Sequence, residues 1–273
     1  MRSAIIPSPG FFLAELDYKN AEYRLAFDYA NEGELIRKIK EEGMDVHEAT
    51  AQLMGVSRKE AKTINFMLLY GGGAKKLAAA LKCDLETAYA KRQRYFDALP
   101  KISAFIESVT RTAERRGFIL NWAGRCVHFP DPRFAYKAPN SLAQGGCGDI
   151  AKRSIIDIDA YLHGKKSRLI LNVHDSNLLE VAYGEEYIIE DISKIMVDAY
   201  PYRHLPQEVD VKFSNKNWGS MQPWEGPKQI SEEELKASLE RLGEQRIFLS
   251  NSVLSEGMRT SWPAQGVRLC GSS

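Results

Sequence analysis

The sequence predicts a fold of the α+β class, and three observations lead to that class. Four short apolar runs with strand character lie near the start and in the second half of the chain, at residues 11–16, 168–173, 178–182 and 208–213. The stretch between the first two runs carries helix start and stop signals instead. Hydrophobic residues make up 44% of the 273 residues, which is enough to bury a sizeable core.

Two helices are predicted by their capping residues. Residues 45–56 open with Asp45, a residue that commonly accepts hydrogen bonds from the first turn of a helix. Residues 57–73 open with Ser57 and carry Glu60 three positions later, which is a capping-box arrangement, and they stop at three glycines.

The following elements are predicted by their breakers. A helix pair is divided by Pro100 and closed by Gly117. Residues 118–129 resemble a hairpin, and a loop rich in Pro and Asn then leads to residues 144–164, a glycine-rich entry into a helix. Another helix is expected over about 185–200.

Residues from about 224 onward differ in character from the rest of the chain. Ser231 and Glu234 give a capping signal for one surface helix, while the last ~25 residues show no sustained period. We therefore expect an appended tail of unknown role.

Charge and cysteine content exclude several classes of protein. Lys and Arg number 37 against 36 Asp and Glu, so no net field points to a polyanionic partner. The four cysteines are far apart and include no C-x-x-C pair, which argues against a zinc site and against a disulfide framework. No run approaches the ~18 apolar residues of a membrane span, so we expect a cytoplasmic protein without a membrane partner. The cysteines are Cys83, Cys126, Cys147 and Cys270.

Polar residues interrupt the apolar stretch VHDSNLL at His174, Asp175 and Ser176. Such residues form turns, so a tight hairpin loop without further function is one interpretation. The other depends on Asp17, which lies at the end of a second apolar run. If the two strands are neighbours, the two carboxylates converge on a divalent ion, and hard oxygen ligands favour Mg²⁺.

A row of side chains recurs every fourth residue in RKEAKTINFMLLY, and four residues advance only ~40° around a helix. The row offers two cations and then two aromatic rings to one space, and the helix carries an apolar stripe on its opposite side. Cations bind phosphates and rings stack on bases, so the row fits a nucleoside triphosphate. A solvated charged face with two tucked rings is the alternative. The row is Arg58, Lys62, Phe66 and Tyr70, and the stripe is Ala61, Ile64 and Leu68.

Three segments together resemble a known family. LDYKNAEYR, RKEAKTINFMLLYG and VHDSNLLEV resemble motifs A, B and C, in that order, of DNA polymerase family A, and the resemblance covers roughly residues 1–224. It implies a DNA-directed DNA polymerase with a palm that has a small antiparallel sheet and a helical fingers subdomain. The implied division is palm 1–29, fingers 30–116, palm 117–224 and tail 225–273.

The resemblance implies a role for each residue at the reaction centre. Asp17 and Asp175 would bind two Mg²⁺ ions, for which Mn²⁺ can substitute, and the backbone carbonyl of Tyr18 would be a further ligand. Arg58 and Lys62 would bind the triphosphate, with Lys62 as a proton donor to pyrophosphate.

The resemblance also implies the residues that contact the base pair and the DNA. Phe66 would stack on the incoming nucleotide, and Tyr70 would lie near the templating base. Glu22 would be the steric gate that excludes a ribose 2′-hydroxyl. The expected DNA contacts are Asn140, Gln144 and His174, which would contact the primer-template without reading its sequence.

Three positions depart from the family pattern. Ser176 stands where motif C usually has Glu, so we expect weaker metal binding with the chemistry retained. Tyr136 stands where the family often has Arg, which removes a contact to the primer unless Lys137 replaces it. Met67 stands where Gly is usual.

Motif A begins within twenty residues of the start of this sequence, whereas family members carry a thumb and often a 3′–5′ exonuclease before it. Two accounts are open: a split polymerase, in which a second polypeptide supplies thumb and exonuclease, or a truncated gene product. The expected partners are primer-template DNA and dNTPs, in a bacterial cell or a phage-infected host. A split polymerase would expose an apolar docking surface.

Two other classes of function compete with polymerisation. A relic that binds nucleic acid without catalysis has no physical need for both metal ligands, yet Asp17 and Asp175 are both present. A two-metal nuclease or phosphohydrolase would use paired aspartates but would leave the Arg-Lys-Phe-Tyr row unexplained.

Overall fold

The four predicted strands and one that was not predicted, β7, form one five-stranded antiparallel sheet in the order β4-β5-β1-β6-β7. The computed structural model describes residues 2–226, and these lie within one compact unit. The mixture of helices and antiparallel sheet confirms the α+β class. The strands are β1 (Phe11–Tyr18), β4 (Arg168–Val173), β5 (Ser176–Ala182), β6 (Val209–Ser214) and β7 (Gln222–Pro223).

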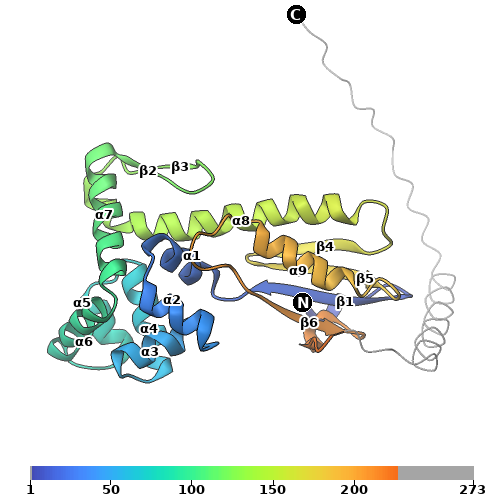
Figure 1. Ribbon diagram of the computed structural model, residues 1–273, viewed down its shortest axis with the longest axis horizontal. Helices are drawn as coiled ribbons and strands as arrows, with labels where there is room; N and C mark the ends of the chain where they lie inside the picture. The colour runs from blue at the N-terminus through green and yellow to red at the C-terminus, as the bar shows by residue number, and fades with distance from the viewer. Residues whose placement is uncertain (1, 227–273) are drawn as a thin grey trace, which may run out of the picture. The chain divides into compact units, whose positions relative to one another are not determined.

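One face of this sheet is covered by two helices, α8 (Ala138–Leu162) and α9 (Ile188–Asp198) (Figure 1). Alternate residues of β1 point to this face and are buried with apolar residues of both helices. Each such apolar side chain contributes about 1.5–3 kcal/mol when fully buried. The opposite face therefore receives the other set of β1 residues, which includes Glu15 and Asp17. The β1 residues on the helix face are Phe12, Ala14, Leu16 and Tyr18.

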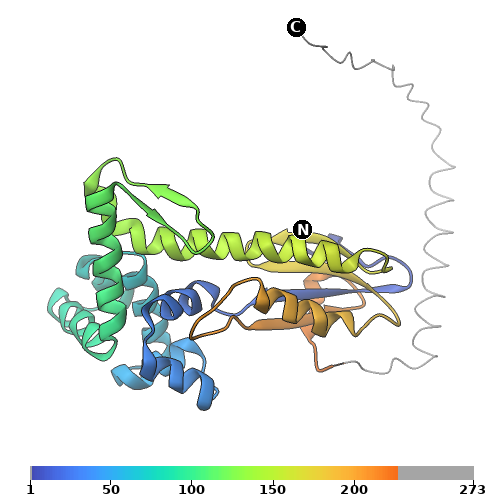
Figure 2. The ribbon, with the colours of Figure 1, turned by 45° about the horizontal axis from the view of Figure 1, so that its top comes forward.

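A second core lies within a group of helices in the first half of the chain. Figures 1 and 2 show α2 to α6 gathered beside the N-terminal end of α8. The largest buried side chains of this core include Phe27, Ile64 and Tyr95. The helices are α1 (Ala21–Ala30), α2 (Gly33–Glu41), α3 (Val46–Met54), α4 (Arg58–Leu69), α5 (Ala74–Leu81), α6 (Leu85–Ala98) and α7 (Pro100–Arg116).

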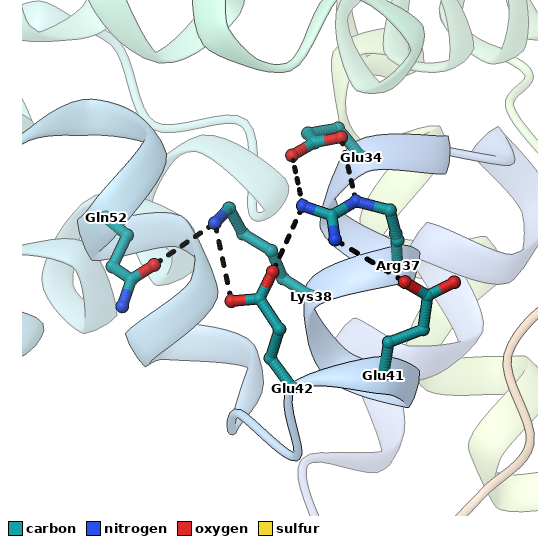
Figure 3. A network of polar contacts seen from close by, with 6 residues as sticks. All are labelled: Glu34, Arg37, Lys38, Glu41, Glu42 and Gln52. Atoms are coloured by element: carbon teal, nitrogen blue, oxygen red, sulfur yellow. Dashed lines mark hydrogen bonds and ion pairs between the residues drawn. The ribbon is translucent and has the colours of Figure 1, made fainter.

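An exposed polar network on α2 extends to α3 (Figure 3). Arg37 contacts three carboxylates of its own segment, and the Lys38 ammonium lies 3.2 Å from the Gln52 amide oxygen on α3. Exposed ion pairs add little to stability, because water already solvates the charges. The network therefore contributes little to the stability of the fold. The carboxylates are Glu34, Glu41 and Glu42.

The capping predictions are confirmed. Asp45 accepts hydrogen bonds from the backbone of the first turn of α3, and Ser57 and Glu60 form a complete capping box on α4. α7 begins at Pro100, and Gly117 closes it in the left-handed conformation. The hairpin is also present, as β2 (Phe118–Leu120) and β3 (Cys126–His128).

The predicted start of the next helix is wrong. α8 begins at Ala138 instead of the glycine-rich segment at 144, so the glycines lie inside the helix. At Gly146 the reason is close packing, since a Cβ there would lie 2.6 Å from Leu25 Cδ2 on α1. Glycine therefore permits α1 and α8 to approach, and it does not mark a loop at this position.

Three short 3₁₀ helices complete the described chain: η1 (Arg2–Ala4), η2 (Pro132–Lys137) and η3 (Trp218–Ser220). Within residues 2–226, no helix has the length and apolar character needed to cross a bilayer. Cys83, Cys126 and Cys147 are free thiols. The tail helix expected near Ser231 and the position of Cys270 lie outside the described residues.

Candidate active site

The sheet register brings the two predicted aspartates together. β1 and β5 are antiparallel neighbours, and Asp17 pairs with Ser176, the residue after Asp175. The backbone N–H of Tyr18 donates to the carbonyl oxygen of Asp175 at 3.2 Å. The two strands are therefore neighbours, which is the condition for the two carboxylates to converge.

Asp175 lies in a two-residue turn between β4 and β5 together with His174. His174 has φ 59°, in the left-handed region that non-glycine residues rarely adopt. Its exposed imidazole Nδ1 lies 3.2 Å from the Asp175 carboxylate. The turn thus presents one imidazole and one carboxylate beside Asp17, in a strained backbone conformation of the kind that is concentrated at functional sites.

The electrostatic field around Asp17 is negative. Burial, followed by the nearby carboxylates of Asp175 and Glu15, raises the pKa of Asp17 to about 6. On the other side of β1, Asp17 pairs with Asp210 and Glu15 pairs with Lys212, and the Lys212 ammonium partly offsets the repulsion.

Donor chemistry at this point of the sheet fits a divalent cation. Two carboxylates and the backbone carbonyls of the strand ends are hard oxygen donors, which Mg²⁺ prefers. Repulsion between Asp17 and Asp175 is relieved when a cation lies between them. Among the described residues no three His, Cys, Asp or Glu side chains are grouped as a complete metal site, so water or substrate oxygens would have to complete the coordination shell.

Ser176 is not placed as a substitute for a carboxylate ligand. The residue is 6% exposed, and its hydroxyl donates to the carbonyl oxygen of Val173 at 3.2 Å. Its hydrogen bond closes the turn that holds Asp175. Where the family usually has a charged Glu, this chain thus has a serine whose hydroxyl stabilises the turn.

The row predicted on α4 lies on one face of that helix. Arg58, Lys62 and Phe66 are exposed and Tyr70 is half-buried, whereas the opposite stripe of Ala61, Ile64 and Leu68 is buried. The Phe66 and Tyr70 rings stack with centroids 5.6 Å apart and planes at 17°.

The cationic end of the row is partly engaged. Arg58 Nε lies 2.7 Å from the carboxylate of Asp45, the N-cap of α3, while Lys62 forms no ion pair within residues 2–226. The Arg58–Asp45 pair lowers the pKa of that carboxyl despite its partial burial. A phosphate that binds Arg58 therefore has to compete with Asp45.

The C-terminal end of α4 is linked to the surroundings of Asp175 through Glu22. The Tyr70 hydroxyl donates a hydrogen bond to the carboxylate of Glu22 on α1. Burial raises the pKa of Glu22, the His174 imidazole lowers it, and the Asp175 carboxylate raises it. Glu22, Tyr70, His174 and Asp175 therefore share one electrostatic environment.

Two residues that support Phe66 were missed by the sequence analysis. The ring of Tyr23 meets Phe66 edge-on at 5.3 Å and His47 at 5.0 Å. His47 Nδ1 lies 3.0 Å from the side-chain nitrogen of Asn65, and burial lowers the His47 pKa to about 4. Tyr23 on α1 and His47 on α3 lie at positions that are typical of residues buried in a helical core, so no sequence motif distinguishes them.

Asp210 and Lys212 were also missed as neighbours of Asp17. Their alternation in EVDVKF predicts a strand but does not say which strand it pairs with. Cys147 on α8 is a further neighbour: burial raises the pKa of its thiol, and Glu22 and Asp175 raise it further.

The predicted DNA contacts on α8 lie one turn apart near its start. The Asn140 side-chain nitrogen donates to the Gln144 oxygen at 3.4 Å, and Gln144 is exposed. The Asn140 side-chain oxygen is buried without a protein partner. A separate cavity of about 720 Å³, lined by Trp122, Asp149 and Asp198 among others, contains none of the predicted site residues.

Comparisons with known proteins agree with the arrangement. The sequence profile of DNA polymerase family A matches residues 1–220. The chain is 33% identical over 230 residues to the thermostable DNA polymerase I of Thermus aquaticus, covering 77% of this chain and 27% of that protein. It is 31% identical over 223 residues to DNA polymerase I of Pseudomonas aeruginosa, covering 73% of this chain and 24% of that protein.

A solved structure shows the same fold. The POL domain of Pol1 from M. smegmatis, in complex with a DNA primer-template and dNTP, superposes with a TM-score of 0.73 at 28% sequence identity. The match covers 80% of this chain and 42% of that chain. This chain thus spans about a quarter of the length of the two relatives described above.

Proposed function

Since the chain belongs to DNA polymerase family A, we propose that it adds deoxynucleotides to a primer 3′-hydroxyl as a DNA template directs. The observation that carries the proposal is the pairing of β1 with β5, which brings Asp17 and Asp175 together. The Asp175 carboxylate acts electrostatically on Glu22, and Glu22 accepts a hydrogen bond from Tyr70 at the aromatic end of α4. A nuclease needs the carboxylates but has no use for the stacked rings. Template-directed synthesis uses both.

In this proposal Asp17, Asp175 and the Tyr18 carbonyl hold Mg²⁺, as two ions that Mn²⁺ can replace. Bound Mg²⁺ lowers the pKa of a primer hydroxyl and neutralises charge on the leaving pyrophosphate. The two carboxylates repel each other, as the raised pKa of Asp17 indicates, so the ionised pair binds a cation strongly. The strand ends fix both carboxylates, and little reorganisation is needed on binding.

Lys62 and Arg58 bind the triphosphate in this proposal, and Lys62 donates a proton to the pyrophosphate. Lys62 is exposed and forms no ion pair in the described part of the chain, so its three donors are available to phosphate oxygens. Arg58 has to exchange Asp45 for phosphate, which adds a cost to binding at that end of the row.

Phe66 and Tyr70 form the stacking surface for the base pair. Their parallel rings offer an apolar face at the end of α4, and Phe66 is the more exposed of the two. Glu22, held by Tyr70, would crowd a ribose 2′-hydroxyl and favour deoxynucleotides. If α4 closes only on a correctly matched base pair, the chain would select the incoming nucleotide by induced fit.

Asn140, Gln144 and His174 are the proposed contacts to primer-template DNA. In this proposal their polar side chains contact the base-edge acceptors that every base pair presents in the minor groove. We assign residues 1–29 and 117–224 to a palm and residues 30–116 to fingers. The cytoplasm of a bacterial cell or a phage-infected host is the proposed location, and a second polypeptide that supplies a thumb stays a prediction.

Primer extension on a labelled primer-template with Mg²⁺ and dNTPs tests the proposal. The variant Asp175→Ala should abolish extension, whereas Asp159→Ala, an exposed aspartate on α8 outside the site, should not change it. Extension that persists in Asp175→Ala contradicts the assignment. No extension by the unaltered chain, with or without a candidate thumb chain, contradicts the proposed function.

A further inference from the structure

The short helix η2 presents two aromatic side chains to solvent. Phe134 is 48% exposed and Tyr136 is 45% exposed. Ala135 between them is fully buried, as is Ala138, and both pack in an apolar cluster with α7 and the β2–β3 hairpin. The buried alanines fix η2 to the fold, so the two rings are held outward instead of turning into the core.

A cation accompanies the two rings. The Lys137 ammonium lies 4.7 Å from the centroid of the Phe134 ring and 5.8 Å from that of the Tyr136 ring. No carboxylate pairs with Lys137 within residues 2–226, whereas neighbouring Arg133 is engaged by Asp131. Exposed rings beside an unpaired cation are the elements that bind single-stranded nucleic acid, by base stacking and phosphate attraction.

The position of Tyr136 relates this surface to the candidate active site. A Cβ added to Gly71 would lie 2.9 Å from the Tyr136 carbonyl oxygen and 3.0 Å from its ring atom Cδ2. Gly71 has φ 70° and directly follows Tyr70, so the Tyr136 ring packs over the turn that ends α4. In the sequence, the proposed DNA contacts Asn140 and Gln144 follow Tyr136 at intervals of four residues, at the start of α8.

We propose that Phe134, Tyr136 and Lys137 form a stacking platform for the unpaired template strand beside the site. The inference rests on the proposed function, because template DNA is its ligand. Tyr70 is proposed to lie near the templating base, and the platform adjoins the turn after Tyr70. An unpaired base stacks on Phe134 or Tyr136, and the Lys137 ammonium attracts the phosphates of the same strand.

A binding experiment tests the platform without requiring catalysis. The full chain is titrated into fluorescent primer-templates that share one duplex and end either blunt or with a 5′ template overhang of about four nucleotides, since stacking sites hold a few bases. The unaltered chain should bind the overhang substrate more tightly than the blunt one. Phe134→Ala should reduce the ratio of overhang to blunt affinity about tenfold, which is the loss expected when one base no longer stacks on a ring.

Matched variants separate stacking from folding. Tyr89→Ala removes a ring that is 57% exposed on α6, away from η2 in sequence, and should keep the full overhang preference. Phe134→Trp keeps an aromatic face and should retain it too. Lys137→Gln should weaken the preference and flatten its dependence on salt. Unchanged melting temperatures for these variants show that the fold is intact.

Two results would overturn the platform: equal binding of blunt and overhang substrates by the unaltered chain, or an overhang preference that survives Phe134→Ala. If the overhang preference survives Phe134→Ala and a protein is found to bind the exposed rings, the surface formed by η2 is a docking site for a protein. Failure of the proposed function gives a different result. If the chain prefers the overhang substrate but does not extend a primer, the proposed catalysis is wrong and the platform is still supported.

Discussion

Asp17 on β1 lies directly across the strand pairing from Ser176 on β5. Paired residues on adjacent antiparallel strands share one face of a sheet, with Cβ atoms about 4.5–5.5 Å apart. The Ser176 side chain therefore faces the same side of the sheet as the Asp17 carboxylate. A negative charge introduced at position 176 would be added to the group of carboxylates around Asp17.

Ser176→Glu should increase the affinity of the chain for Mg²⁺. A third carboxylate raises the negative charge of the site, and cation affinity follows ligand charge and number. We expect about tenfold tighter binding, equivalent to about 1.4 kcal/mol. Without metal the new charge should destabilise the fold by about 1 kcal/mol, because it repels Asp17.

Melting temperature against Mg²⁺ concentration measures both effects for Ser176→Glu. The isosteric variant Ser176→Cys is the control, since it changes the hydroxyl without adding a full charge. Mg²⁺ should raise the melting temperature of Ser176→Glu more than that of Ser176→Cys. Equal responses of the two variants to Mg²⁺ would contradict the assignment of a metal site to this sheet edge.

The pH dependence of stability should carry a contribution from His47. Its side chain is 1% exposed and faces the cations Arg58 and Lys62 as well as Asp45, and burial lowers its pKa from 6.5 to about 4. Because the folded pKa is below the unfolded one, this stability is present above pH 6.5 and is lost as pH falls towards 4. Between about pH 7 and pH 5 the loss should be about 2 kcal/mol.

Urea unfolding at the two pH values tests the His47 contribution. His47→Gln should be less stable than the unaltered chain at about pH 7 and should lose less stability on acidification. His163→Gln, which changes an exposed histidine, should leave the pH dependence as it is. Identical pH dependence in His47→Gln and the unaltered chain would mean that His47 does not titrate in this window.

Glu22 and Tyr70 should control discrimination between sugars. Glu22→Ala removes the carboxylate proposed to crowd a 2′-hydroxyl, so the ratio of ribonucleotide to deoxynucleotide incorporation should rise by tenfold or more, as contacts of about 1–3 kcal/mol allow. Tyr70→Phe keeps the ring stacked on Phe66 but removes the hydrogen bond to Glu22, so it should raise the ratio by less.

Single-nucleotide extension with matched ribo- and deoxynucleoside triphosphates gives the ratio. Tyr89→Phe, a distant exposed tyrosine, is the control for loss of a hydroxyl. An unchanged ratio in Glu22→Ala, with extension intact, would show that another residue excludes the ribose.

The strands and the α4 row could be predicted because their signals are local, whereas the pairing of the strands that carry Asp17 and Asp175 followed only from the resemblance to the family. Apolar runs end at each aspartate, and a spacing of four places the row on one helix face. The two-residue turn is likewise short enough to be marked by its own polar residues.

Long-range packing explains what the sequence did not reveal. The glycines at 145, 146 and 148 suggest a helix entry, but Gly146 is needed where α1 crosses α8, a contact more than a hundred residues apart in sequence. Asp210 joins the site only because β6 pairs with β1, and strand pairing is not encoded in EVDVKF alone. The platform on η2 depends similarly on burial of Ala135 by distant elements.

Asp28 on α1 should be a main anchor of the loop that positions β6. Its carboxylate is 2% exposed and accepts hydrogen bonds from the Tyr200 hydroxyl at 2.6 Å and from three consecutive backbone N–H groups, those of Arg203, His204 and Leu205. Asp28→Ala removes the acceptor of all these donors, of which those of Tyr200 and Leu205 are buried and the other two partly buried, so the free energy of unfolding should fall by about 3–5 kcal/mol.

Graded variants decide whether Asp28 acts through these hydrogen bonds. Tyr200→Phe removes one donor and should lower the free energy of unfolding by about 1 kcal/mol. The loss for Asp28→Asn should lie between the losses for Tyr200→Phe and Asp28→Ala, because an amide accepts through one oxygen only. Asp198→Ala, which changes an exposed aspartate, should cost little. Equal costs for Asp28→Ala and Asp198→Ala would contradict the anchor. Because the anchored loop leads into Val209 and Asp210, Asp28→Ala should also loosen the strand beside Asp17, and faster hydrogen exchange of β6 amides than of β5 amides would show it.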